Sequence, residues 1–252
     1  MPDFQHRSLA RNSKAKIINS KMKGHFMTDV MEKIRPRSLE EVVGNEATKI
    51  KLNDWLSSEE KLRTLCFHGG IGCGKTLLAD IAATALGAPE KSFNRQLINV
   101  SRFTNENIRD VTDQMGSRSG FALSHGGWEV YMFDEAHHIP DLGQAMLLAP
   151  AANPPKGTIM IFMTSKPEDL DPGLRSRCLE FELGPLTRSE TLELLERGCN
   201  AAGVRLDEGV LKGIAKAAKG NPRNALIQLA TELNRAEAER NQNNANQEVC
   251  CV

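Results

Sequence analysis

Short apolar stretches recur along the first three quarters of the chain and set its expected architecture. They predict β-strands at 64–68, 96–100, 129–133, 158–163 and 179–183. Segments with helical spacing of apolar residues separate most of these stretches, and strands that alternate with helices predict a parallel sheet covered on both faces. The third and fourth stretches are apolar nearly throughout, as is typical of central strands in such a sheet. We therefore expect an α/β core.

Beyond residue 185 the pattern becomes purely helical. Thr187 and Glu190 have the spacing of a capping box, which predicts a helix through about residue 199. A second helix is expected over about 207–218. Asn221 and Pro222 suit the N-cap and first turn of a third helix. Together these helices predict a small three-helix domain.

The chain thus divides into four expected segments. These are a basic, flexible leader at 1–32, the α/β core at 33–185, a helical lid at 186–236 and a polar disordered tail at 237–252. Within the core, before its first strand, a helix is expected over 46–56.

Composition is that of a soluble globular protein, with 40% hydrophobic and 25% charged residues and a formal net charge of zero among 252 residues. Basic residues nevertheless concentrate in the first 37 positions, which suits either an arm that contacts phosphates or acidic partners, or a solvated leader. The sequence has no secretory apolar region and no apolar run near the ~18 residues of a membrane span. Its cysteines lack C-x-x-C spacing. We expect no membrane association and an intracellular location in the cytoplasm, nucleoid or nucleus.

Candidate chemistry begins with the segment 69–76, which reads G-G-I-G-C-G-K-T and matches the P-loop pattern G-x-x-x-x-G-K-T. Its glycines allow backbone N–H groups to surround phosphate oxygens, and the following helix adds its positive end. Lys75 is expected to reach the β- and γ-phosphates, and the Thr76 hydroxyl to bind Mg²⁺. A glycine-rich turn without a ligand would rarely have a strand before it and a helix after it. The expected nucleotide-binding residues are Gly69, Gly70, Ile71, Gly72, Cys73, Gly74, Lys75, Thr76 and Leu77.

The apolar stretch 129–133 ends in two acids, Asp134 and Glu135. In P-loop ATPases a strand of this kind lies beside the P-loop strand, and we place it there. Asp134 would then hold Mg²⁺ through water, and Glu135 would orient and deprotonate the attacking water. Alone, the pair would equally suit an acidic turn. Residues 134–137 also spell the helicase box D-E-A-H, but 252 residues leave no room for a second motor domain.

Two further sites follow in the chain. Thr164 and Ser165 end the next strand, where a hydroxyl suits the γ-phosphate or the lytic water, although a simple strand end explains them as well. Arg175 and Arg177 flank Ser176, and an arginine fork suits a transferring phosphoryl group. Without context the two arginines are a charged surface.

In this order the motifs resemble AAA+ ATPases of the clamp-loader clade, as in replication factor C small subunits and their bacterial and phage equivalents. The resemblance covers about residues 33–235 and is most specific at the triplet 176–178, which reads S-R-C. It includes 220–225, which reads G-N-P-R-N-A, a motif that branch-migration motors also carry. It implies a P-loop AAA+ core with a five-stranded parallel sheet, followed by a three-helix lid.

The resemblance also implies roles for individual residues. Arg177 would be an arginine finger that acts on ATP held by a neighbouring subunit. Thr164 or Ser165 would be the first sensor, and Arg223 the second sensor, touching the γ-phosphate in cis. The segment 34–46 is similar to the family segment that packs near the adenine; its expected contacts are Arg35, Pro36 and Val43.

The implied function is that of an ATP-hydrolysing subunit of a DNA sliding-clamp loader in replication, with ATP and Mg²⁺ as cofactors. Its partners would be other AAA+ subunits in a homo- or hetero-oligomeric, pentameric arc, a sliding clamp and primer–template DNA. The segments 99–102 and 108–111 are similar to the family region that follows a DNA phosphate backbone. The alternatives are another AAA+ remodeller without a clamp (a branch-migration motor, a helicase loader or a defence ATPase), or a nucleotide switch that does not hydrolyse.

Three features depart from the family pattern. The chain ends about 20 residues after the lid, without the collar domain, so the collar is dispensable, is supplied by another chain, or the protein is not a true clamp loader. Pro150 is expected to break the helix that precedes the fourth strand. Cys73 replaces the usual threonine of the loop, but only its backbone matters there, so ATP binding is expected to survive.

Overall fold

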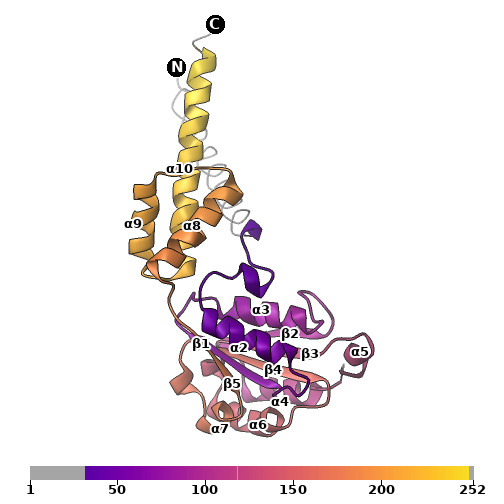
Figure 1. Ribbon diagram of the computed structural model, residues 1–252. Helices are drawn as coiled ribbons and strands as arrows, with labels where there is room; N and C mark the ends of the chain where they lie inside the picture. The colour runs from indigo at the N-terminus through magenta and orange to yellow at the C-terminus, as the bar shows by residue number, and fades with distance from the viewer. Residues whose placement is uncertain (1–31, 118, 250–252) are drawn as a thin grey trace, which may run out of the picture. The chain divides into compact units, whose positions relative to one another are not determined.

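The computed structural model describes residues 32–117 and 119–249, and the chain separates into two compact units. One is the α/β unit Pro36–Leu186. The other is a helical unit whose described part comprises residues 32–35 and 187–249. Figure 1 shows the sheet and its covering helices in the first unit and the helices of the second. The predicted basic leader lies almost entirely outside the described residues.

Five parallel strands form a single sheet, as predicted, and each strand differs from its predicted range by at most one residue at either end. The strand order is β2-β3-β4-β1-β5, and the register of every neighbouring pair is parallel. The strands are β1 (Thr64–Gly69), β2 (Arg95–Asn99), β3 (Glu129–Asp134), β4 (Thr158–Thr164) and β5 (Leu179–Leu183).

The predicted position of β3 beside the P-loop strand is wrong. β4 lies between β1 and β3 and pairs with both. All seven residues of β4 are buried, as expected for the middle strand of a five-stranded sheet. The apolar pattern of a strand predicts that the strand is buried, but it does not predict which strands lie beside it. The position of β4 between β1 and β3 could therefore not be predicted from the local sequence.

Helices cover both faces of the sheet, which confirms the predicted layering (Figure 1). Alternate residues of β1, β3 and β4 belong to different hydrophobic clusters. Phe67 packs on one face with α2 (Glu46–Ser57) and α3 (Lys75–Ala85). Cys66 packs on the other face with α4 (Asn105–Gln114), α6 (Asp141–Ala152) and α7 (Pro172–Arg175). This period of two follows from the pleat. The shorter elements are η1 (Leu39–Glu41), η2 (Val100–Arg102), α5 (Ser119–Ser124), η3 (Ala136–His138) and η4 (Pro167–Asp169).

Pro150 does not break its helix, contrary to the prediction. α6 continues through it and ends at Ala152. A proline removes one backbone hydrogen bond. Here the lost bond belongs to the last turn of the helix, so few helical residues follow it. Leu147 and Ala151 on either side of it are buried in the core, so tertiary packing holds the turn.

The helical unit contains α8 (Arg188–Ala202), α9 (Glu208–Ala218) and α10 (Pro222–Val249). The predicted capping box is present: the Glu190 amide donates to the Thr187 hydroxyl at 3.2 Å, and the Thr187 amide donates to the Glu190 carboxylate at 2.7 Å. Leu195 and Leu229 are fully buried where the helices meet.

α10 is longer than predicted, because it runs through the expected tail as far as Val249. The segment 236–240 is rich in alanine, glutamate and arginine, and no glycine or proline follows Pro222 to interrupt the helix. In the described ranges, no helix combines the length and apolarity needed to cross a membrane.

Candidate nucleotide-binding site

The P-loop joins the end of β1 to the start of α3, and its glycines have conformations that other residues adopt with difficulty. Gly72 and Gly74 have φ values of 77° and 108°. Gly69 has φ of 146°, and a Cβ placed on it would lie 2.2 Å from the carbonyl oxygen of Leu183 in β5. These positions therefore require glycine, and the loop keeps its backbone uncovered by side chains.

The N-terminus of α3 is left without a side-chain cap. Gly74 occupies the N-cap, no acidic residue stands in the first turn, and the first helical hydrogen bond runs from the Leu78 amide to the Gly74 carbonyl at 3.0 Å. The amides of Lys75, Thr76 and Leu77 precede that bond. Helix N-termini with uncapped amides attract anions, so this end of α3 suits a phosphate.

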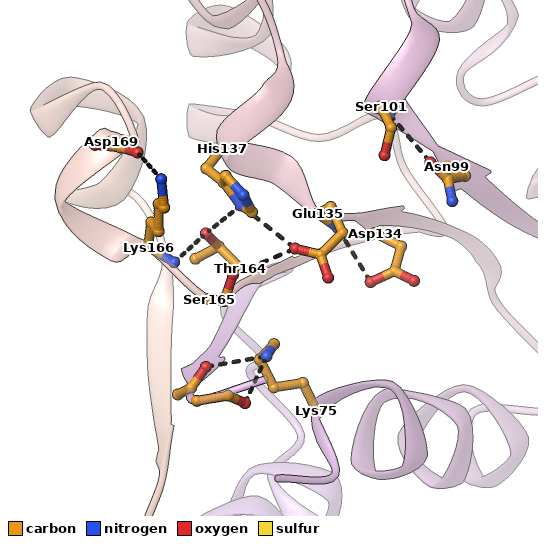
Figure 2. Close-up of polar contacts among 12 residues, drawn as sticks. Lys75, Asn99, Ser101, Asp134, Glu135, His137, Thr164, Ser165, Lys166 and Asp169 are labelled. Atoms are coloured by element: carbon orange, nitrogen blue, oxygen red, sulfur yellow. Dashed lines mark hydrogen bonds and ion pairs between the residues drawn. The ribbon is translucent and has the colours of Figure 1, made fainter. Parts of the chain in front are cut away.

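Lys75 is the first residue of α3 and is only 6% exposed. Its ammonium donates to the carbonyls of Gly69 and Gly70, each at 3.0 Å (Figure 2). A buried cation needs such partners. The contacts hold the predicted phosphate ligand directly against the loop.

Cys73 packs its thiol into the hydrophobic core beneath the loop and is 8% exposed. Its amide donates to the Gly70 carbonyl at 3.3 Å and belongs to the turn itself. Since the side chain points into the core, exchanging the usual threonine for cysteine changes core packing more than the phosphate-facing backbone. That ATP binding survives the exchange stays a prediction.

The ends of β4 and β3 bring the sensor and acidic residues to the same edge of the sheet as the P-loop. Thr164 is the register partner of His68, the residue before Gly69. Asp134 ends β3, which pairs with the other side of β4. The carboxyl ends of parallel strands share one edge, so β4 places Thr164 between the P-loop and the acids.

Glu135 has a left-handed backbone, with φ of 55° and ψ of 44°. For a residue with a side chain this conformation costs about 1 kcal/mol. Its amide donates to Asp134 Oδ1 at 3.1 Å (Figure 2). The turn thereby separates the two carboxylates, one at the strand end and one directed toward β4.

His137 is a site residue that the sequence reasoning missed. Its Nδ1 lies 3.1 Å from Thr164 Oγ1 and 3.5 Å from Glu135 Oε2, as Figure 2 shows. Ser165 donates to the same Glu135 oxygen at 3.4 Å. Burial, aided by the neighbouring His138, lowers the pKa of His137, so the ring is neutral near pH 7. The signal for this residue in the sequence is the histidine that ends the D-E-A-H motif at 134–137. From sequence alone, we considered that motif only as a helicase box.

Arg175 and Arg177, the two arginines considered for phosphoryl transfer, have different environments. Arg175 is ion-paired with Glu180 of β5. Arg177 donates to the Gly173 carbonyl at 2.5 Å and makes no ion pair with any residue in the described ranges. Arg177 therefore keeps most of its donors available, whereas Arg175 serves to fix the turn.

The remaining predicted contacts lie at several places in the fold. Pro36 and Val43 are half-buried in the segment before α2, and this segment is tied to the end of β5 by the Gly184 amide, which donates to Asn45 Oδ1 at 2.8 Å. Arg35 is exposed, and Arg223 is exposed in the first turn of α10 in the helical unit. Their predicted roles at the adenine and the γ-phosphate stay predictions.

The donor set suits Mg²⁺ bound together with a nucleotide. The Thr76 hydroxyl and the Asp134 carboxylate are hard oxygen ligands, and Mg²⁺ in phosphate sites commonly takes one or two protein ligands beside phosphate oxygens and water. The glycine cradle and the uncapped helix end fit the phosphates themselves. The predicted ligands therefore fit the ion, and the assignment stays a prediction.

Comparison with known proteins agrees with these features. Residues 65–185 match the AAA family, the ATPase family associated with various cellular activities. The chain is 29% identical to DNA polymerase III subunit gamma/tau of Mycobacterium tuberculosis, over 77% of this chain and 37% of that protein. It is 27% identical to the replication factor C large subunit of Natronomonas pharaonis, over 81% of this chain and 41% of that protein. The chain thus spans less than half the length of these relatives.

A solved structure has the same fold. The RuvB Holliday junction branch migration motor of Thermotoga maritima matches with a TM-score of 0.65 and 24% identity, over 77% of this chain and 63% of that one. Residues 65–185 therefore form a domain of the AAA family of ATPases, and the chain is homologous to the clamp-loader subunits DNA polymerase III gamma/tau and replication factor C.

Proposed function

We propose that the chain is an ATP-hydrolysing subunit of a DNA sliding-clamp loader. The observation that carries the proposal is the shared sheet edge, where β1, β4 and β3 bring together Lys75, Thr164 and the pair of acids at 134–135. Each of these groups suits a different part of phosphoryl transfer. Homology to DNA polymerase III gamma/tau and replication factor C favours a place in replication.

In the proposed reaction, the loop amides and Lys75 hold the β- and γ-phosphates. Glu135 orients a water molecule and accepts its proton, and the Thr164 hydroxyl donates to the γ-phosphate or to that water. Mg²⁺ held by Thr76 and Asp134 would neutralise charge on the phosphate oxygens. From the helical unit, Arg223 would touch the γ-phosphate as second sensor.

Arg177 is proposed to act on the ATP of a neighbouring subunit. An arginine finger needs free donors in a fixed fork, and Arg177 uses one donor on Gly173. The Arg175–Glu180 pair anchors the turn that carries it. In other NTPases a finger supplied in trans is worth roughly 10³–10⁵ in rate, so hydrolysis would depend on assembly.

The proposed partners are other AAA+ subunits in an arc, a sliding clamp and primer–template DNA, within the cytoplasm or nucleoid. The DNA contact would involve α4, whose N-terminus carries the capping pair Thr104 and Asn107 and whose Arg109 is exposed. Contacts of this kind to the phosphate backbone are independent of DNA sequence.

The deciding experiment measures ATP turnover by the full chain co-purified with its native neighbours. We expect primer–template DNA and the clamp together to stimulate turnover beyond either alone. Stimulation by DNA that is unchanged by any clamp would favour the alternative, an AAA+ remodeller such as a branch-migration motor. ATP binding without turnover under all these conditions would contradict both and favour a nucleotide switch.

A further inference from the structure

The side chain of His137 connects two groups that the proposed reaction uses separately. The residue lies on η3, directly after the left-handed turn at Glu135, and its side chain is 6% exposed. A single ring nitrogen, Nδ1, faces Thr164 Oγ1 at 3.1 Å and Glu135 Oε2 at 3.5 Å (Figure 2). The imidazole therefore bridges the end of β4 and the turn after β3.

The position of the proton on this ring follows from its neighbours. Both atoms that face Nδ1 are oxygens, and one belongs to a carboxylate. A lone pair on Nδ1 would oppose the carboxylate oxygen, whereas a proton there can be shared between the two oxygens. A neutral imidazole carries one such N–H. We therefore assign the tautomer with the proton on Nδ1.

This assignment fixes the direction of the Thr164 hydroxyl. A hydroxyl offers one donor and two lone pairs. The Lys166 amide donates to Thr164 Oγ1 at 3.0 Å, and His137 supplies the second donor to the same oxygen. Both lone pairs are then occupied, and the O–H proton is what the hydroxyl has left to offer to a phosphate oxygen or a water molecule.

The same contacts restrain Glu135. Its Oε2 accepts from Ser165 and faces His137, whereas none of its polar contacts with other described residues involves Oε1. One oxygen is thus held and the other is left to accept a proton. Groups held in this way before a reaction need no reorganisation during it.

We propose that His137 is a positioning residue, which sets the Thr164 hydroxyl as a donor and holds the Glu135 carboxylate in place through one Nδ1–H group. The inference rests on the proposed ATP hydrolysis at this site. It assigns His137 no direct contact with ATP, and it predicts an effect on turnover rather than on binding.

Two amide variants separate this role from simple packing. In His137→Asn the amide nitrogen can take the place of Nδ1, whereas in His137→Gln it reaches the place of Nε2. Both remain polar, and glutamine is closer to histidine in length. His138→Ala is the matched control, because this exposed ring packs against His137 in a tilted arrangement, with centroids 4.1 Å apart, but the ring makes no polar contact with Thr164 or Glu135.

The experiment measures kcat and the Kd for ATP in the presence of Mg²⁺, using the full chain co-purified with its native neighbours. We expect kcat to fall about tenfold in His137→Gln and His137→Ala, the effect of losing one hydrogen bond that supports the transition state. His137→Asn should retain kcat within about threefold and His138→Ala should match wild type, with ATP affinity changed by no more than about twofold throughout.

Several results would overturn the proposal. These are wild-type kcat in His137→Gln, equal losses in the asparagine and glutamine variants, or an equal loss in His138→Ala. If His137→Ala fails to fold, the two amide variants decide. If the wild-type chain with its native neighbours binds ATP but never hydrolyses it, the proposed function fails and this inference with it. A failure confined to the His137 variants leaves the proposed function standing.

Discussion

The carbonyl oxygen of Leu183 lies 2.2 Å from the point where a side chain on Gly69 would begin. This contact joins the end of β5 to the first glycine of the P-loop, and both partners are backbone. We predict that Gly69→Ala lowers the free energy of unfolding by about 2 kcal/mol or more, since strand or loop must shift.

Gly70→Ala is the control for that prediction. No heavy atom lies within 4 Å of a Cβ at Gly70, and its φ is not positive. Its unfolding free energy should stay within about 0.5 kcal/mol of wild type in urea titration. Equal destabilisation by the two substitutions would show that the Leu183 contact does not constrain the loop.

Glu135 should be required for turnover but not for ATP binding. Replacing it with glutamine removes the base while keeping nearly the same shape, and we expect Glu135→Gln to lower kcat at least about 100-fold and to retain ATP. Nucleotide retained after gel filtration, compared with turnover, measures this. Glu168→Gln, an exposed acid on η4, should behave as wild type. Undiminished turnover in Glu135→Gln would remove Glu135 from the mechanism.

If Arg177 acts on the ATP of a neighbouring subunit, two variants that are inactive alone should restore ATP turnover when they are mixed. Arg177→Ala keeps an intact nucleotide site but lacks the finger, and Lys75→Ala keeps the finger but lacks the phosphate ligand. Each alone should hydrolyse ATP at least about 100-fold more slowly than wild type. Mixed together they should regain turnover that depends on their ratio. A mixture no more active than its components would argue against a finger shared between copies of this chain.

The Arg175–Glu180 pair predicts a pH-dependent stability. The hydrogen bond and charge of Arg175 lower the pKa of the Glu180 carboxyl below its usual value of 4.5. Its folded pKa lies below its unfolded one, so the pair stabilises the fold above about pH 4.5, and this contribution is lost as the pH falls through the folded pKa. Glu180→Gln should therefore lower Tm at pH 7.

The difference in Tm between Glu180→Gln and wild type should shrink steadily as the pH is lowered below about 4. Glu182→Gln changes an exposed neighbour on β5 that forms no ion pair with the described residues, and it should leave Tm unchanged at pH 7. A Glu180→Gln deficit that stays constant with falling pH would mean that packing, not the charge pair, explains it.

Features with a local cause could be predicted from the sequence. The strands follow from apolar stretches bounded by polar residues, and the loop at 69–76 from its glycine spacing between a strand and a helix. The capping box of Thr187 and Glu190 depends on residues three apart and was located directly. In each case the residues that carry the signal are close together in the chain.

Features that depend on tertiary neighbours could not be predicted. The insertion of β4 between β1 and β3 is a choice among topologies that no single strand encodes. Pro150 lies inside α6 because buried neighbours hold the last turn. The bridge from His137 to Thr164 joins residues 27 positions apart and exists only because β4 is adjacent to β3.

The most direct test is equilibrium binding of ATP to the full chain, with and without Mg²⁺, beside Lys75→Met, which keeps the apolar stem and removes the ammonium. We predict that wild type binds ATP more tightly with Mg²⁺, and that Lys75→Met loses at least about tenfold in affinity while remaining folded. No ATP binding by folded wild-type chain, or equal affinity in Lys75→Met, would contradict the assignment of residues 69–76 as a phosphate-binding loop.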